Sequence, residues 1–317
     1  MARKVYTYQD NSLRPNSRET VKNASSPEQS LYTVGQNGDF STLNAALDHL
    51  SQFELSNSDI EVRMLSGFVV EETLTLTKKD FRFVTLTSED VEVPISTEYM
   101  FTLPGSQYFL QASNTVCPNI GTMFAFDTDF DLPTVSGTDR QKGGIFIANS
   151  QLQIDSSNLH NGKFCGIKNA PTYGIIASTN SNLLLDFNSR VINCGRIVDQ
   201  LSGGPLDWAT NVAGITSRII MSGALVTGSN RNGVLLLAGS YLYAQQTNGQ
   251  ECAHRGLYVE ASHANVRFSA FRLTPGEDSI NDIELTAGSI LQASGSSIGG
   301  ANINPNEFTS NGIIIRA

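Results

Sequence analysis

Acidic side chains are the residues of this sequence best suited to chemistry on a glycan. Hydrolysis of a glycosidic bond needs two carboxyl groups about 5 to 10 Å apart, one as acid and one as base or nucleophile. Acids at matching positions of stacked strands, about 4.8 Å apart, would meet that spacing. The candidates are Glu260, Asp282 and Glu284 near the C-terminus, Asp127, Asp129 and Asp131 in an irregular segment, and Asp155 and Asp186 at expected strand ends. Because the chain contains 30 Asp and Glu residues, a solvated acid or a turn-capping aspartate is the simpler interpretation of each.

A lyase site would need a basic residue beside acids that bind a uronate carboxylate or a calcium ion. His254 and Arg255, close in sequence to Glu251 and Glu260, form the most suggestive group of this kind. The "DTDFD" segment at 127–131 loosely resembles a calcium loop, but it lacks the glycine and the terminal glutamate of an EF-hand. No Walker A, HExxH or CxxC motif occurs. We therefore expect no cofactor and no metal ion, and the sequence favours a protein without catalytic activity.

Two aromatic residues and one arginine are the candidates for binding a glycan without catalysis. Trp208, the only tryptophan, lies in "GGPLDWATN", which we interpret as a loop between two repeats. An exposed aromatic face can contact the C–H surface of a sugar. The glycan-binding candidates are therefore Trp208, Tyr173 and Arg255. A hydrophobic plug or a subunit contact is the alternative interpretation of Trp208.

The composition is typical of a β-rich protein with many turns. The chain has 317 residues, 27 of them glycine, and only 16% are charged, below the usual quarter. The net charge is −9 without a basic cluster, which disfavours nucleic acids and anionic membrane surfaces as partners. The four cysteines are widely spaced, which predicts buried reduced thiols. No apolar signal core and no apolar run of membrane length occurs, so we expect no membrane insertion.

A two-strand unit recurs in the second half of the chain. The stretch "NGVLLLAGSYLYAQQTNG" at 232–249 has the pattern of a strand, a small polar corner and a second strand. Similar units begin at Gly144, Gly174, Gly214, Gly256 and Asp282. The shorter intervals between units suit one coil of a solenoid, and the longer ones suit a coil with an inserted loop.

The repeat predicts an all-β solenoid in the form of a single-stranded parallel β-helix. One coil of short strands cannot bury its inner face alone, whereas stacked coils enclose a column of inward side chains. The expected inward residues are Val234, Leu236, Leu242, Ile283, Leu285 and Ile290. An antiparallel sandwich is the alternative, but few two-residue hairpin signals join matched strands.

The segments before the repeats have different characters. Residues 1–30 are polar without a sustained period, and we interpret them as an extended N-terminal arm, with a disordered leader as the alternative. Ser41 is the candidate N-cap of an amphipathic helix at 41–52, which would cap the open end of a solenoid domain spanning 31–317. Residues 97–141 follow no clear pattern, and we interpret them as a large loop or a modified turn.

"VGQNGDFSTLNAALDHLSQF" (34–53), followed by a strand and a run of coils, resembles the entry to a known family of structures. These are the pectate-lyase-like right-handed parallel β-helices of bacteriophage spike and fibre proteins, in which a G-D-F-x-T-L-x-x-A-L segment forms the capping helix. The tail "NPNEFTSNGIIIRA" (304–317) is similar to the short N-G-I-I endings of such proteins. The resemblance covers the chain from about Leu31 onward. It is specific for architecture rather than function, because the scaffold hosts lyases, hydrolases and non-enzymatic adhesins.

The resemblance implies a homotrimeric spike of a phage or phage-like particle, assembled in the host cytoplasm and exposed on the virion surface. The N-terminal arm would attach it to other virion proteins of the head or tail. The candidate anchor residues are Arg3, Tyr6, Tyr8 and Leu13. The spike would bind a host surface polysaccharide without catalysis. A polysaccharide depolymerase of the lyase or glycoside hydrolase type and a purely structural head or tail component are the alternatives.

Overall fold

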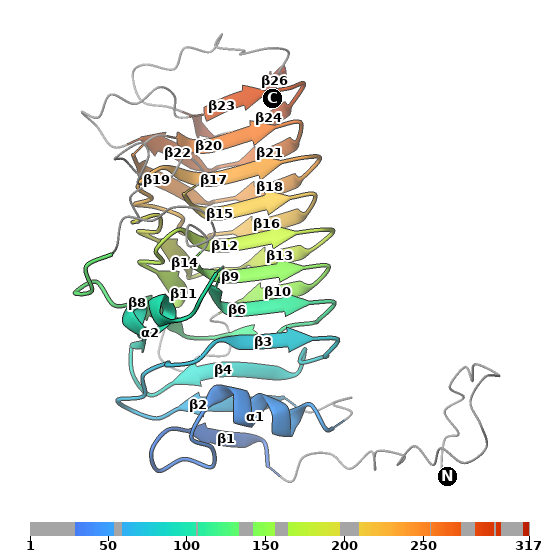
Figure 1. Ribbon diagram of the computed structural model, residues 1–317. Coiled ribbons are helices and arrows are strands. Elements are labelled where there is room, and N and C mark those ends of the chain that lie inside the picture. The colour runs from blue at the N-terminus through green and yellow to red at the C-terminus, as the bar shows by residue number, and fades with distance from the viewer. Residues whose placement is uncertain are drawn as a thin grey trace, which may run out of the picture.

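The structure, a computed structural model, is a parallel β-helix in which every coil contributes strands to parallel sheets (Figure 1). It describes residues 29–53, 59–105, 107–132, 142–155, 164–196, 209–253, 255–273, 283–294, 296–298 and 313–316. All strand pairs are parallel, and each strand pairs with its equivalents in the coils before and after it. The predicted solenoid is confirmed, and an antiparallel sandwich is excluded.

Three sheets, here named A, B and C, form the sides of the coils. Sheet A contains β1 (Leu31–Val34), β2 (Ile60–Met64), β4 (Val84–Ser88), β7 (Asn119–Ile120), β10 (Gln151–Ile154), β13 (Asn182–Leu185), β16 (Arg218–Ser222), β18 (Tyr241–Gln245), β21 (His263–Arg267), β24 (Ile290–Ser294) and β26 (Ile313–Arg316). Sheet C contains β3 (Leu74–Thr77), β6 (Gln107–Ser113), β9 (Lys142–Ala148), β12 (Tyr173–Ser178), β15 (Thr210–Ile215), β17 (Asn232–Leu237), β20 (Arg255–Glu260) and β23 (Ile283–Thr286).

Sheet B is the shortest side of the coil and has two parts. The first contains β5 (Glu92–Ile95), β8 (Met123–Phe126), β11 (Cys165–Lys168) and β14 (Ser189–Ile192), and the second contains β19 (Asn248–Cys252), β22 (Ala270–Leu273) and β25 (Ser297–Ile298). Single parallel bridges from Arg190 to Leu225 and from Leu225 to Asn248 connect the two parts. The chain runs from C to A to B and back to C in each complete coil.

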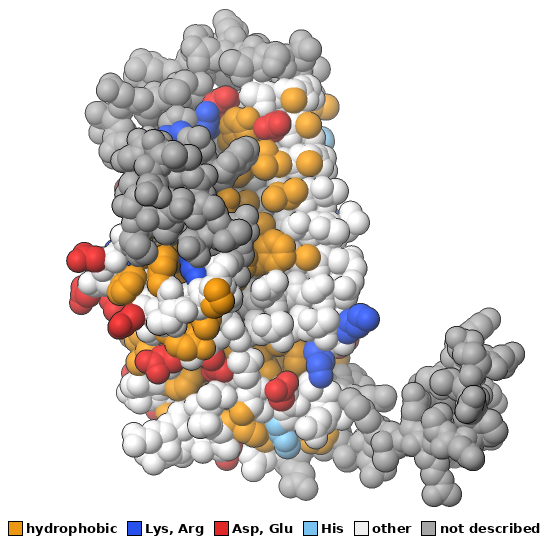
Figure 2. Space-filling view, viewed as in Figure 1, with side chains coloured by type: hydrophobic (Ala, Val, Ile, Leu, Met, Phe, Trp, Pro, Cys, Tyr) orange, Lys and Arg blue, Asp and Glu red, His pale blue; other side chains and the backbone are white. Residues whose placement is uncertain are grey.

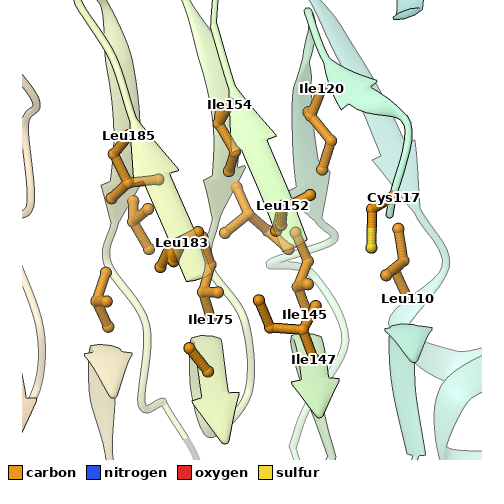
Figure 3. Close-up of a cluster of buried hydrophobic side chains, with 14 of the residues drawn as sticks. Leu110, Cys117, Ile120, Ile145, Ile147, Leu152, Ile154, Ile175, Leu183 and Leu185 are labelled. Carbon is orange, nitrogen blue, oxygen red and sulfur yellow. The ribbon is translucent and has the colours of Figure 1, made fainter. Parts of the chain in front are cut away.

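The core is a column of aliphatic side chains in register between coils (Figure 3). In sheet A, one buried row runs from Leu152 through Leu183, Ile219 and Leu242 to Leu291. Each strand alternates such inward residues with outward ones, since successive side chains of a strand point to opposite faces. Burying a side chain of this size contributes about 1.5 to 3 kcal/mol, so the column is the main source of stability.

Of the six residues predicted to face the core, four are buried and a fifth is partly buried. Val234, Leu236, Leu242 and Leu285 are buried in the column, and Ile283 is partly buried against it. The expectation for Ile290 was wrong, because Leu291 occupies the inward position and Ile290 pairs with the outward His263. A shift of one residue reverses the face of every side chain in a strand.

A helix covers the first coil, as the sequence predicts. It is α1 (Leu43–Leu50), which packs Leu43, Ala46, Leu47 and Leu50 inward. Its N-cap is Thr42 rather than Ser41, because the Thr42 hydroxyl accepts from the Ala45 amide at 3.2 Å. The Glu72 carboxylate also accepts from the Leu43 and Asn44 amides in the first turn. Within the described residues, neither helix is long or apolar enough to cross a membrane.

The interpretation of 97–141 as a large loop or modified turn was wrong. This segment contains the short helix α2 (Thr97–Thr102) and a complete coil made of β6, β7 and β8. Its strands carry buried residues such as Phe109, Ile120 and Phe124. Strands β7 and β8 have only 2 and 4 residues, which is too short for an alternating pattern to be recognised in the sequence.

The turns between sheets C and A contain a continuous ladder of buried hydroxyl groups, here named the serine ladder. Its side-chain oxygens belong to Ser150, Ser181, Ser217, Ser240, Ser262 and Ser289. Each accepts a hydrogen bond from the backbone amide at the same corner of the preceding coil, at 3.0 to 3.4 Å. Each therefore satisfies a buried N–H that would otherwise cost about 1 to 3 kcal/mol. The serine-rich corners of the sequence are structural.

The cysteines are free and buried, which confirms the expected thiols. Desolvation raises the pKa of each to about 12. At neutral pH these thiols are protonated and behave as small apolar core groups.

Candidate functional site

The three corners of the coil differ in the length of their connections. From the coil of β9 onward, two or three residues join sheet C to sheet A, as at 216–217 and 238–240. We name this the ladder corner. The connections from sheet B to sheet C include 96–106, 127–141, 169–172, 193–209 and 253–254, and we name this the loop corner. Binding residues concentrate on loops that a rigid scaffold positions, so a binding site is expected at the loop corner.

A cleft of about 430 Å³ lies on the outer face of sheet B beside the loop corner. That volume is within the range of small-molecule sites. Its floor comes from one outward row, in which Pro94 of β5 pairs with Ala125 of β8 and Ala125 pairs with Lys168 of β11. Val69, which lies on the coil before β5, continues the wall and is 45% exposed.

An ion pair crosses this floor. The Lys168 ammonium lies 2.5 Å from both carboxylate oxygens of Glu92, although the two residues are 76 positions apart. They come from β11 and β5, which are separated by β8, so the two long side chains meet over the outer face of β8. There the floor residue is Ala125, which is small enough to leave room for the pair and for the cleft.

Asp127 lies at the end of β8 and is held by several elements. Its carbonyl oxygen accepts from the Thr97 hydroxyl at 2.9 Å and from Nη1 of Arg196 at 3.2 Å. Nη2 of Arg196 also donates to the Thr128 carbonyl at 3.1 Å. One Asp127 carboxylate oxygen accepts from the Asp129 amide at 2.8 Å. The backbone that presents this exposed carboxylate is therefore fixed from α2 and from the connection after β14.

Glu71 brings a third carboxylate to the cleft. The bridge between Val70 and Ile95, together with the pairing of Ile95 with Phe126, places Glu71, Ser96 and Asp127 at successive positions across the coils. The backbones of Glu71 and Asp127 are thus about 9.5 Å apart, twice the spacing of neighbouring strands. Figure 2 shows acidic side chains gathered around α2 and β8.

Three of the residues singled out in the sequence meet elsewhere, on the outer face of sheet C. Arg255 forms an ion pair with Glu284, and its guanidinium carbon lies 4.9 Å from the centre of the Tyr258 ring. The Tyr258 hydroxyl lies 3.0 Å from a Glu260 carboxylate oxygen. Burial, reinforced by the two carboxylates, raises the pKa of Tyr258, although a hydrogen bond with Thr286 opposes this. The arrangement is a polar cluster in which each charged group has a partner.

Tyr173 lies on the same sheet, half-buried against an outward apolar cluster that includes Tyr108 and Ile176. Desolvation raises its pKa to about 12. The aspartates of the "DTDFD" segment are exposed, and across the described ranges no three acidic, histidine or cysteine side chains are placed to share a metal ion. Asp155 and Asp186 follow paired strands and lie on neighbouring coils.

Several sequence candidates lie outside the described residues. They are Trp208, His254, Asp282, Arg3, Tyr6, Tyr8 and Leu13.

Sequence reasoning found Asp127 but missed Glu71, Glu92 and Lys168. No motif surrounds these three residues, and they become neighbours only through the pairing of coils that are distant in sequence. The one usable signal is that Glu92 and Lys168 are charged residues in short strands whose buried members include Val93, Ile95 and Ile167.

No known family model and no curated protein sequence matches the chain. Among solved structures, the Dettilon tailspike protein is similar with a TM-score of 0.34 and 9% identity, over 82% of this chain and 62% of that one. The chain thus spans less than two thirds of the tailspike's length. The pectin methylesterase from Aspergillus niger in deglycosylated form has a TM-score of 0.29 and 13% identity, over 92% of both chains. Both similarities are too remote to support a functional argument.

Proposed function

We propose that the protein is a surface spike of a phage or phage-like particle that binds a host cell-surface glycan through the cleft on sheet B. The cleft is the observation that carries this proposal. It combines small-molecule size, apolar wall residues such as Val69 and Pro94, and fixed polar groups from Asp127, Glu92 and Lys168. Such a mixture suits a sugar, which presents apolar C–H faces and many hydroxyl groups.

The rod-like scaffold supports the same role. Binding residues on the outer face of a solenoid lie along a line, and extended binding surfaces are the usual product of stacked repeats. A polymer of sugars could continue from the cleft along sheet B. The attachment of the N-terminal arm to a virion is supported by the sequence resemblance.

We also propose that the spike is a homotrimer. Exposed aromatic side chains at the corner between sheets A and B support lateral packing of subunits, since Phe187 and Phe268 are 64% and 65% exposed. Sedimentation equilibrium of the full chain should give three times the monomer mass. A monomer at micromolar concentration would contradict this part of the proposal.

Retention on host envelope fractions tests the glycan-binding role. The purified protein should bind capsule or lipopolysaccharide of its host and release neither reducing ends nor unsaturated sugars. Protease treatment of the fraction should leave binding unchanged, and digestion of its glycan should remove it. Absence of binding to every envelope fraction would contradict the proposal.

A depolymerase is the second candidate function, and one observation favours it. Glu71 and Asp127 both line the cleft at positions two coils apart, and side chains on such backbones can bring their carboxyl groups to the separation of about 6.5 to 9.5 Å that inverting glycosidases use. An enzyme of this kind would release reducing ends from the host glycan. The Asp127→Asn variant would then lose this activity while still binding the polymer.

A further inference from the structure

The charge of the cleft carries information about its ligand. Among the described residues that line it, Glu71, Glu92 and Asp127 supply three carboxylates, whereas Lys168 is the one cation. Arg196 lies nearby, but its guanidinium donates to the Asp127 and Thr128 carbonyl oxygens. Even with Arg196 counted beside Lys168, these named side chains of the described residues carry one net negative charge.

The ammonium of Lys168 is already engaged. Both oxygens of Glu92 lie 2.5 Å from it, so a carboxylate of a ligand would have to displace Glu92 and leave that acid without its cation. Glu71 and Asp127 have no ion pair within the described part of the chain, and both are exposed. A ligand carboxylate or phosphate in the cleft would therefore be repelled.

Glu71 and Asp127 are arranged on either side of one position. Ser96 lies between Glu71 and Asp127 in the pairing of successive coils. A cationic group above Ser96 would be within reach of both carboxylates, because the backbone of each acid lies about 4.8 Å away along the axis. The exposed side chains of Val69 and Pro94 would contact the apolar face of the same ligand.

We propose that the cleft selects a sugar unit that carries a free protonated amino group, a hexosamine without an acetyl substituent. This inference rests on the proposed glycan-binding function and names the class of glycan. The ammonium lies between Glu71 and Asp127, and the sugar ring lies against the apolar wall. The Glu92–Lys168 pair offers an acceptor and a donor to the ring hydroxyls.

Binding of defined oligosaccharides tests the inference. The probes are a glucosamine oligomer, its N-acetylated counterpart of equal length, and an oligogalacturonate, each titrated into the full-length protein at pH 6 by calorimetry. We expect about tenfold tighter binding of the glucosamine oligomer than of the acetylated one, and no measurable binding of the galacturonate. The preference should shrink as salt is added, because charge pairs at exposed sites are screened.

Two variants separate the role of the cleft from that of net charge. The Glu71→Gln/Asp127→Asn double variant should bind the glucosamine and acetylated oligomers equally. Glu98→Gln removes an exposed acid of α2 that does not line the cleft, and it should keep the preference. Circular dichroism and thermal unfolding should show that both variants are folded.

The remaining outcomes distinguish this inference from the proposed function. Equal binding of the two oligomers, or tighter binding of the galacturonate, would overturn the amino-sugar inference and leave glycan binding intact. Binding of none of the probes, together with no binding of any host envelope fraction, would overturn both.

Discussion

The ladder corner and the loop corner are built from the same kind of coil but serve different purposes. At the ladder corner, turns of two or three residues repeat, and the hydroxyl of one coil binds the amide of the coil before it. At the loop corner, connections range from 253–254 to 193–209, and a cleft lies beside them. A solenoid can therefore keep one corner uniform for stability while another varies in length and borders a cleft.

The physical reason is the different cost of changing each corner. A ladder turn is joined to its neighbours on both sides by buried hydrogen bonds, so a change in one coil affects the next. A longer surface loop adds only a slowly growing closure entropy, about 0.6 kcal/mol for each doubling of its length. Variation should therefore be tolerated at the loop corner and penalised at the ladder corner.

Insertions should give the largest difference between the corners. A Gly-Ser-Gly-Ser insertion after Thr216 interrupts the serine ladder on both sides of Ser217, where each lost partner costs about 1 to 3 kcal/mol. We expect the free energy of unfolding in urea to fall by about 3 kcal/mol or more, or the protein to become insoluble. The same insertion after Asn230, in the loop corner, should cost less than about 1 kcal/mol. Equal losses at the two positions would show that the corners do not differ in this way.

Removal of one rung should have the next largest effect. In Ser217→Ala, the buried amide of Ser181 loses the acceptor that lies 3.3 Å away. The expected loss of unfolding free energy is about 1 to 3 kcal/mol, measured by urea denaturation. Ser222→Ala, at an outward position of β16 in sheet A, is the matched control and should stay within about 0.5 kcal/mol of the wild type. If both variants behave alike, the ladder is not a source of stability.

At the loop corner, a change should affect binding more than stability. Arg196→Met removes the two hydrogen bonds that fix the carbonyls of Asp127 and Thr128. We expect glycan affinity to fall about three- to tenfold, equivalent to about 0.7 to 1.4 kcal/mol, while the unfolding free energy changes by less. Arg218→Met, on the exposed face of sheet A, is the control for loss of a cation. Unchanged affinity in Arg196→Met would show that the position of residues 127–128 does not matter for glycan binding.

The Glu92–Lys168 pair should have the smallest effect on stability. The side chains are 41% and 23% exposed, and ion pairs at such positions contribute about 0.2 to 1 kcal/mol. A double-mutant cycle with Glu92→Gln and Lys168→Met should give a coupling energy in that range, which decreases at high salt. A coupling of several kcal/mol would mean that the pair belongs to the scaffold and is not a displaceable part of the cleft.

The ladder corner could be predicted from the sequence far better than the loop corner. The units at Gly214 and Gly233 repeat their pattern of strand, small polar corner and strand, because every coil meets the same steric and hydrogen-bonding demands. The alternation of apolar and polar residues predicted which side chains face the core. The prediction failed at Ile290 because the inward position is one residue later, at Leu291.

The cleft could not be predicted, for two physical reasons. Sheet B strands such as β5 and β11 have four residues, too few to show a period, and β5 contains Pro94 in its outward row. In addition, Lys168 meets Glu92 because their strands lie two coils apart in sheet B. The number of residues between them in the sequence does not reveal this. Inserted loops change that separation from coil to coil, so local patterns carry no information about which outward residues meet.

Matched substitutions at the two corners test most directly whether the outer face of sheet B holds the glycan site. Ala125→Leu places a larger side chain on the floor of the cleft, whereas Ala148→Leu makes the same change at an outward position of the ladder corner. Binding of the host glycan fraction is measured for both variants and the wild type, together with their unfolding midpoints. We expect Ala125→Leu to lose at least tenfold in affinity with an unchanged midpoint, and Ala148→Leu to bind like the wild type. Wild-type affinity in a folded Ala125→Leu variant would contradict the assignment of the site to this cleft.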